Sequence, residues 1–277
     1  MKKNALERFW QFLPAIILLT GFMASCKNND NPNDNNPVTN DPAPGALGFS
    51  IIKTYPHDIS SYTEGLEFYK GELYEGTGNY NESRLMKLDL KTGKAIKQID
   101  LDKKYFGEGI TILNDTVYQL TYQENTAFTY SVKDFKKIKE FVFSTDTKQG
   151  WGMTNDGKSL IVTDGSSNLY FFQPSTFNLV KKLPVTDAGS LTFNLNEVEY
   201  VDGFVYANQW QYSYILKIDI ATGKVVAKAD CSELVRIAKE KNPSIDVFNG
   251  IAYDKATKKF YVTGKYWPDI YEIQFSQ

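Results

Sequence analysis

Gly65-Leu-Glu-Phe68, followed after a short break by Gly71-Glu-Leu-Tyr-Glu75, is the first copy of a pattern that recurs along the chain. The copies begin at residues 65, 109, 152, 197 and 250, so their spacings are 44, 43, 45 and 53 residues. Each copy consists of a short strand, a turn and a second alternating strand. Repeats of about 40–45 residues that hold several strands are typical of β-propellers.

Each repeat also predicts outer strands. Third strands are expected at 85–90, 127–132, 169–173, 215–220 and 270–275, and fourth strands at 95–101, 137–143, 179–185 and 225–229. The fifth repeat lacks a fourth strand, but residues 49–55 alternate and precede the first repeat. The sequence therefore predicts an all-β fold, a five-bladed β-propeller of four-stranded blades whose N-terminal strand closes the last blade. The rival fold, a β-sandwich, does not explain five similar repeats.

The longer last spacing holds residues 232–241, which are predicted to form a short amphipathic helix with Leu234, Ile237 and Ala238 on its apolar side.

Composition excludes several classes of function. The formal net charge is −2 with a pI of about 5.6, so no basic surface for nucleic acid is expected. One His and two Cys in 277 residues are too few for a zinc finger, a disulfide framework or a His-dependent triad. Cys231 is interpreted as a small buried hydrophobic residue, and His57, next to Pro56, as a surface histidine.

The N-terminal residues have the pattern of an export signal. Lys2, Lys3 and Arg8 precede an apolar run, 12–23, and small residues precede Cys26. We interpret 1–26 as a lipoprotein-type signal that ends at Cys26, which becomes the lipidated N-terminus. The alternative is a plain signal peptide with an incidental Cys. The expected location is that of an exported lipoprotein, anchored in the bacterial membrane and facing the periplasm or the cell surface.

The next segment, 27–46, contains seven Asn, three Asp and four Pro without apolar periodicity. It is predicted to be a flexible tether because it cannot bury a core. The propeller domain is then expected over 47–277.

The repeat register also locates a site. In a propeller the first strand of each blade lines the central channel, so the residues just before each repeat converge at one mouth of the channel. Those residues include two acids and several aromatic rings. The ends of the second strands add two more rings and one ammonium group. The nine candidates are Tyr62, Glu64, Phe106, Glu108, Tyr122, Trp151, Asn196, Trp210 and Lys265. A concave aromatic pocket with a few polar groups is the usual small-ligand site. The alternative is aromatic packing alone, which does not explain two Glu and one Lys.

At this point the sequence resembles the plant-type glutaminyl cyclases, the glutamine cyclotransferase family. The resemblance runs in order over about residues 50–275. Its motifs include Phe106-Gly-Glu-Gly-Ile-Thr111, Trp151-Gly-Met-Thr-Asn-Asp-Gly157, Leu195-Asn-Glu-Val-Glu-Tyr-Val201, Asn249-Gly-Ile-Ala-Tyr-Asp254 and Val262-Thr-Gly-Lys-Tyr-Trp-Pro268.

The resemblance implies an enzyme, a glutaminyl-peptide cyclotransferase. Such an enzyme converts an N-terminal Gln of a peptide to pyroglutamate and releases ammonia, and it does so without a metal or other cofactor. The family's proton-transferring Glu falls on Glu108. Its pocket aromatics fall on Tyr62, Phe106, Trp151 and Trp210, and its polar binding groups on Asn196 and Lys265. The expected partners are peptides or proteins with N-terminal Gln, and the chain is expected to act as a monomer.

Three positions depart from the family pattern. Tyr62 and Tyr122 stand where the family has Phe and Trp, and Glu64 stands where it has Gln. Glu64 is the most consequential, because it adds a second carboxyl beside Glu108 or offers a partner to the substrate's α-ammonium. A propeller that binds peptides or another ligand without turnover, and a structural lipoprotein scaffold, are the alternatives to an active enzyme.

Overall fold

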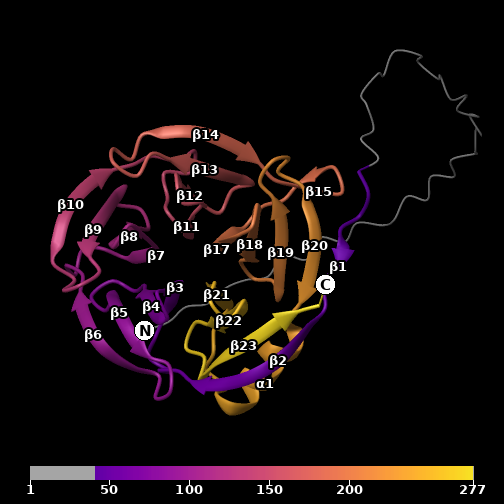
Figure 1. The fold of residues 1–277 in the computed structure, drawn as a ribbon, viewed down its shortest axis with the longest axis horizontal. Helices are drawn as coiled ribbons and strands as arrows, with labels where there is room; N and C mark the ends of the chain where they lie inside the picture. The colour runs from indigo at the N-terminus through magenta and orange to yellow at the C-terminus, as the bar shows by residue number, and fades with distance from the viewer. Residues whose placement is uncertain (1–40, 277) are drawn as a thin grey trace, which may run out of the picture. The chain divides into compact units, whose positions relative to one another are not determined.

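Each repeat folds into one antiparallel sheet in the computed structural model, which describes residues 41–276, and the five sheets form a ring (Figure 1). The first blade contains β3 (Thr63–Tyr69), β4 (Glu72–Thr77), β5 (Arg84–Asp89) and β6 (Lys94–Asp100). The second contains β7 (Gly107–Leu113), β8 (Thr116–Thr121), β9 (Thr126–Ser131) and β10 (Lys137–Val142). The third contains β11 (Met153–Asn155), β12 (Leu160–Val162), β13 (Asn168–Phe172) and β14 (Leu179–Pro184).

The remaining blades complete the ring. The fourth contains β17 (Leu195–Val201), β18 (Phe204–Gln209), β19 (Tyr214–Asp219) and β20 (Val225–Asp230). The fifth contains β21 (Phe248–Asp254), β22 (Lys259–Gly264), β23 (Asp269–Phe275) and the N-terminal β2 (Phe49–Pro56). The predicted five-bladed propeller is confirmed, and the predicted third and fourth strands begin and end within one residue of the observed ones.

Closure of the ring depends on the pairing of β2 with β23. The register runs antiparallel from Phe49 opposite Phe275 to Pro56 opposite Asp269. Figure 1 shows β2 at the outer edge of the ring, with β23 beside it on the inner side. The last blade is therefore made from both ends of the sequence, as the lone alternating strand predicted.

The hydrophobic core of the described residues is divided among the contacts between neighbouring blades. Each of its five clusters joins two adjacent blades; for example, Leu66 and Met86 of the first blade pack with Ala252 and Ile270 of the fifth. The innermost strands approach closely at glycines. A Cβ on Gly109 of β7 would lie 2.5 Å from the carbonyl oxygen of Trp151, so any side chain there would force two blades apart.

The pairing of the segment before β2 was not predicted. β1 (Gly45–Ala46) pairs in parallel with β20, and Lys224 Nζ lies 2.6 Å from Asp41 Oδ1. The last two residues of the expected tether, Gly45 and Ala46, thus supply a fifth strand to the fourth blade. The predicted signal, 1–26 with Cys26, and tether residues 27–40 lie outside the described residues.

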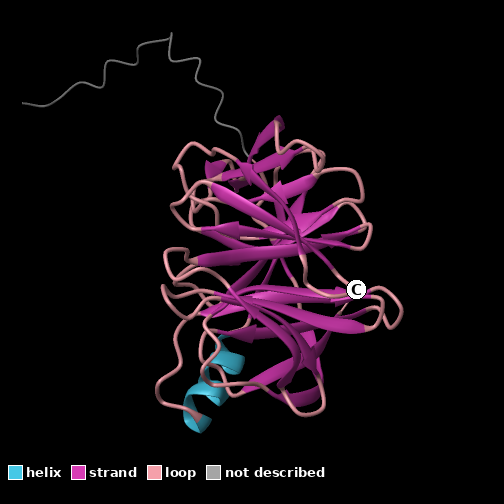
Figure 2. Ribbon diagram, turned by 90° about the vertical axis from the view of Figure 1, so that its left-hand side faces the viewer, coloured by secondary structure: helices cyan, strands magenta, loops and turns pink. Residues whose placement is uncertain are grey.

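The segment between the third and fourth blades contains a small hairpin that was also not predicted, β15 (Thr186–Asp187) with β16 (Ser190–Leu191). The predicted helix is confirmed as α1 (Ser232–Lys241), with Leu234 and Ala238 buried, and it projects from one face of the propeller (Figure 2). Within residues 41–276, no helix has the length and apolar character that a membrane span needs. Cys231 is a free, buried thiol, as expected.

Candidate active site

One pocket lies at the end of the channel where the innermost strands begin, and its volume is about 240 Å³. Its lining consists of the nine candidates named from the sequence, which are Tyr62, Glu64, Phe106, Glu108, Tyr122, Trp151, Asn196, Trp210 and Lys265. The structure therefore brings all nine together. Their individual roles in binding and catalysis stay predictions.

The polar groups of the pocket occupy equivalent places in different blades. Glu64, Glu108 and Asn196 are each the second residue of an innermost strand, β3, β7 and β17. The strand register shifts at each of these positions, between Thr63 and Gly65 in the first case. Such irregularities re-aim side chains next to functional sites. They explain how a residue in a regular sheet can point toward the mouth of the channel.

Aromatic rings form the walls of the pocket. Tyr62 and Phe106 meet edge to face with centroids 6.1 Å apart, Phe106 and Tyr122 lie 5.7 Å apart, and Trp151 and Trp210 meet edge to face at 5.8 Å. The wall residues need glycines behind them. A Cβ on Gly165 would lie 2.7 Å from the Trp151 ring.

Gly78 supports the other side of the pocket in the same way, because a Cβ there would overlap the Phe106 ring. Both glycines lie in turns between second and third strands. Neither was predicted, since their contact with the rings depends on residues of other turns.

The charged groups of the pocket form one buried network. Lys265 Nζ donates to Glu64 Oε1 at 2.7 Å and lies 4.3 Å from the centroid of the Tyr62 ring. Asn249 Nδ2 donates to Glu64 Oε2 at 3.2 Å. Burial raises the pKa of Glu64 to about 7, although the ammonium of Lys265 lowers it. Burial would lower the pKa of Lys265, but the carboxylates of Glu64 and Glu108 outweigh it and raise that pKa.

Glu108 differs from Glu64 because its Oε2 is buried without a hydrogen-bond partner in the described part of the chain. Only 5% of the residue's surface is exposed. Burial and, after it, the negative charge of Glu64 raise the pKa of Glu108 well above its usual value, while the Lys265 ammonium counteracts part of the effect. Burial therefore outweighs the ammonium in setting the pKa of Glu108.

Two residues around the pocket were missed as site residues. Asn249 occupies the equivalent strand position in the fifth blade, and its side-chain amide donates a hydrogen bond to Glu64. Asp246 accepts a hydrogen bond from the Tyr62 hydroxyl at 3.4 Å, and Tyr62 also packs against Tyr266 at 5.2 Å. The repeat register pointed to Asn249, whereas Asp246 lies in a segment without repeat counterparts.

The prediction that His57 lies on the surface is wrong. Its side chain is fully buried, and Nε2 lies 3.1 Å from Glu75 Oε1. Nδ1 lies 2.9 Å from the carbonyl oxygen of Trp267, and Thr63 Oγ1 donates to Glu75 Oε1 at 2.7 Å. This cluster joins the fifth blade to the first, directly behind Glu64. Burial would lower the pKa of His57, but the carboxylate of Glu75 outweighs it and raises the pKa.

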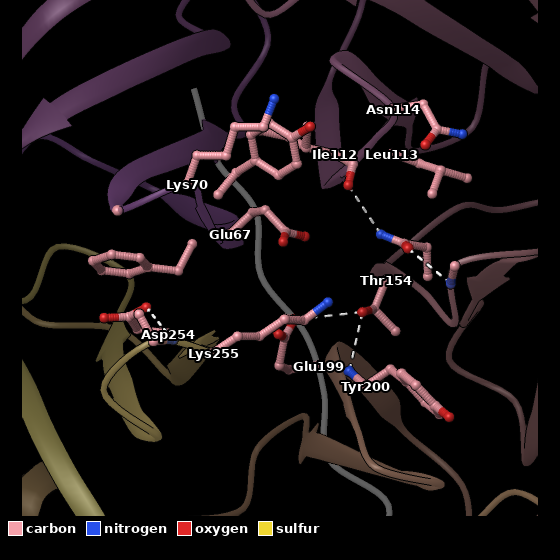
Figure 3. Close-up of a pocket in the computed structure, with 16 residues that line it drawn as sticks. Glu67, Lys70, Ile112, Leu113, Asn114, Thr154, Glu199, Tyr200, Asp254 and Lys255 are labelled. Carbon is pink, nitrogen blue, oxygen red and sulfur yellow. Dashed lines mark hydrogen bonds between the residues drawn. The ribbon is translucent and has the colours of Figure 1, made fainter.

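A larger cavity of about 530 Å³ lies where the innermost strands end, opposite the candidate site. Figure 3 shows the carboxylate of Glu67 and the ammonium of Lys255 projecting into it, with Glu199 and Thr154 beside them. Thr111 Oγ1 donates to Glu67 Oε2 at 2.9 Å. This cavity was not predicted, and it contains none of the nine candidate residues. Among residues 41–276, no cluster of three or more His, Cys, Asp and Glu side chains is arranged to hold a metal ion.

Comparison with known proteins identifies the family. The family model described as glutamine cyclotransferase matches residues 18–275. A glutaminyl-peptide cyclotransferase of Arabidopsis thaliana is 39% identical over 230 residues, which make up 82% of this chain and 71% of the plant protein. The crystal structure of a Myxococcus xanthus glutaminyl cyclase matches with a TM-score of 0.78 and 33% identity over 84% of this chain and 98% of the bacterial one. With a five-bladed propeller and an acidic, aromatic pocket at one mouth of its channel, the chain belongs to the glutamine cyclotransferase family of enzymes.

Proposed function

We propose that this protein converts the N-terminal Gln of peptides to pyroglutamate and releases ammonia. The observation that carries the proposal is the carboxyl group of Glu108, which is buried, lacks a partner for Oε2 in the described chain, and lines a pocket with aromatic walls. The names of the plant and myxobacterial relatives support the same activity.

The proposed reaction is intramolecular. The α-amine of the substrate attacks the carbon of its own γ-carboxamide, so a new C–N bond closes the lactam ring. The C–N bond to the carboxamide nitrogen then breaks, and ammonia leaves. Because the nucleophile is tethered in the substrate, the main task of the enzyme is to hold the folded-back conformer and to move a proton. The walls formed by Phe106, Trp151 and Trp210 are suited to holding it.

Glu108 is proposed to move the proton. Its carboxylate accepts a proton from the attacking amine and delivers it to the departing nitrogen, which leaves as ammonia. A raised pKa suits this exchange, because it makes the carboxylate a stronger base toward the attacking amine than an ordinary Glu side chain. Gly107 and Gly109 flank Glu108 and keep side chains away from the approaching substrate backbone.

Asn196 and Lys265 are proposed to bind the carboxamide oxygen as it becomes negatively charged. An ammonium has three donors, and Glu64 takes one of those of Lys265. Asn196 accepts a hydrogen bond from Thr163 through its backbone carbonyl oxygen, which leaves its side-chain amide available to substrate. Donors that are already positioned stabilise an oxyanion strongly in a site that excludes water.

We also propose that the reaction needs no metal. The pocket offers two carboxylates but no imidazole or thiol, whereas a catalytic zinc ion takes three protein ligands. Export and anchoring through a lipid on Cys26 are proposed from the signal pattern at residues 1–26.

The direct test is to incubate the full chain with a Gln-initiated peptide and to follow its mass. Loss of one ammonia from the peptide supports the proposal. The same peptide with a blocked α-amine is the control, since it has no nucleophile. A protein that binds the peptide without changing its mass would be the non-catalytic binder considered as the alternative.

A further inference from the structure

We propose that the substrate residues after the N-terminal Gln lie on an apolar shelf formed by Phe193 and Trp210, and that this shelf makes the enzyme prefer an aromatic or large apolar residue there. The inference rests on the proposed function. It extends the site from a pocket for one residue to a surface for a peptide.

The size of the pocket requires such a surface. Sites for drug-sized ligands have volumes of about 300–1,000 Å³. This pocket, at about 240 Å³, has room for little more than one amino-acid residue. Since both the α-amine and the side chain of Gln must be inside to react, only its carbonyl can lead out of the mouth. The following residues must therefore contact the rim.

Two sides of the rim are already occupied by side chains that bind each other. Tyr62 packs on Tyr266 on one side, and on another side Tyr80 packs on Phe106 at 5.4 Å while its hydroxyl donates to Glu124 at 3.0 Å. Phe193 contrasts with these residues. It is 54% exposed, and its ring has no aromatic partner among residues 41–276.

Phe193 is held directly beside the pocket wall. Its carbonyl oxygen accepts a hydrogen bond from Gln209 Nε2 at 3.0 Å, next to Trp210. The following residue, Asn194, donates its N–H to the carbonyl oxygen of Gly165 at 2.9 Å and accepts from the N–H of Trp210 at 2.8 Å. Gly165 in turn packs against Trp151. The backbone that carries Phe193 is thus bonded to the supports of both tryptophans.

This arrangement distinguishes Phe193 from an ordinary exposed apolar residue. Single surface hydrophobics are common and carry no function. Phe193, however, stands on a backbone that hydrogen bonds tie to the segment of Trp210 and to the glycine behind Trp151. A rigid aromatic residue loses little conformational entropy when a ligand packs on it, so such residues are effective in recognising peptides. The shelf fits an aromatic side chain better than a charged one, because Phe193 and Trp210 offer apolar contact area but no charged group to pair with an ion.

The test compares three amidated tripeptides, Gln-Ala-Ala, Gln-Phe-Ala and Gln-Ala-Phe, by kcat/KM with the full chain. At least one Phe peptide should be favoured by about two- to tenfold, the range that aromatic pairs contribute. Phe193→Ser should bring the ratio of kcat/KM for the Phe peptide to kcat/KM for Gln-Ala-Ala close to one, and Phe193→Tyr should retain the wild-type ratio. Ile59→Ser is the matched control, because Ile59 is 58% exposed on another loop of the same face and should leave the ratio unchanged.

A binding measurement makes the test independent of turnover. Dissociation constants of the same peptides for Glu108→Gln should show the same preference, and Phe193→Ser combined with Glu108→Gln should lose it. Equal dissociation constants for all three peptides, or a preference that survives Phe193→Ser, would show that the substrate does not bind on Phe193. If the wild type turns over none of the peptides but still binds them with this preference, the cyclase proposal fails and the shelf stands.

Discussion

Lys265 Nζ lies 2.7 Å from Glu64 Oε1, and both side chains are almost completely buried. The cation of the pocket is therefore paired before any substrate arrives. A buried pair of this kind is costly to break, because removal of one partner leaves the other charge unpaired. The pair also places a negative charge near Glu108, whose pKa it raises after the larger effect of burial.

The first prediction concerns Glu108. Glu108→Gln keeps the size of the side chain but cannot carry a proton, so kcat/KM on a Gln peptide should fall by about 10²–10⁴-fold or more. Melting curves should stay close to those of the wild type. Glu140→Gln, which changes an exposed acid of β10, is the matched control. Full activity of Glu108→Gln would remove Glu108 from the mechanism.

The second prediction concerns Glu64. In Glu64→Gln the negative charge that helps to raise the pKa of Glu108 is gone, so the acidic limb of the pH profile of kcat/KM should move to lower pH. The profile should also become simpler, since two coupled carboxyls no longer titrate together. The loss of activity at pH 8 should be smaller than the roughly 10²-fold minimum expected at Glu108. An acidic limb that moves to higher pH, or a greater loss than in Glu108→Gln, would mean that the proton passes through Glu64 instead.

The third prediction concerns the buried pair of His57 and Glu75. The pKa of His57 is raised above its ordinary value of 6.5, so the protonated form is favoured by folding. The pair's contribution to the free energy of unfolding should be complete below pH 6.5 and should decline as pH rises through the folded-state pKa. His57→Gln should cost about 3–5 kcal/mol at pH 6 and less at high pH.

Urea unfolding across this pH range measures the effect of His57→Gln, with Glu75→Gln as the companion variant. Because His57 is the only His in the chain, a single imidazole NMR signal reports its titration directly. A His57 pKa below 6.5, or a variant as stable as the wild type at pH 6, would contradict the assignment of an ion pair.

The fourth prediction is that metal chelators leave turnover unchanged, because the donor set of the pocket lacks the imidazole and thiol groups that zinc prefers. The measurement is kcat/KM on a Gln peptide before and after dialysis against a chelator. Loss of activity that added zinc restores would show that the metal-free mechanism is wrong.

The fifth prediction concerns Cys26. Cys26→Ser should release the protein from the membrane fraction of expressing cells and abolish its labelling with a fatty-acid analogue, since acylation requires the thiol. Cys231→Ser is the control and should remain in the membrane fraction. If Cys26→Ser still fractionates with membranes, residues 1–26 are not a lipoprotein signal.

The fold was predictable because each blade repeats the same local pattern. Strand alternation, turn residues and spacing recur in every copy, so an error in one repeat is corrected by the others. The pairing of β1 with β20 was not predictable, because Gly45 and Ala46 follow an Asn- and Pro-rich segment and have no alternation. Their strand exists only because β20 offers a free edge.

The membership of the site was predictable for the same reason, since residues at equivalent positions of a ring must converge. Its interactions were not. Nothing in the sequence indicates whether Lys265 pairs with Glu64 or with Glu108, because the distances depend on the register shifts at the start of each inner strand. The environment of His57 was missed because it is made by Glu75 and Trp267, which are distant in the chain.

The closure of the ring by β2 and β23 sets the order in which the molecule can be assembled. Phe49 finds its partner, Phe275, only after the more than 200 residues between them have been synthesised, and contacts of such long sequence separation form slowly. Until then β2 has no neighbour, and the fifth blade cannot form. A chain cut short before Asp269 leaves two unpaired sheet edges exposed, and such edges are templates for aggregation. We therefore expect partial chains that lack β23, rather than the closed propeller, to be the species most in need of chaperones.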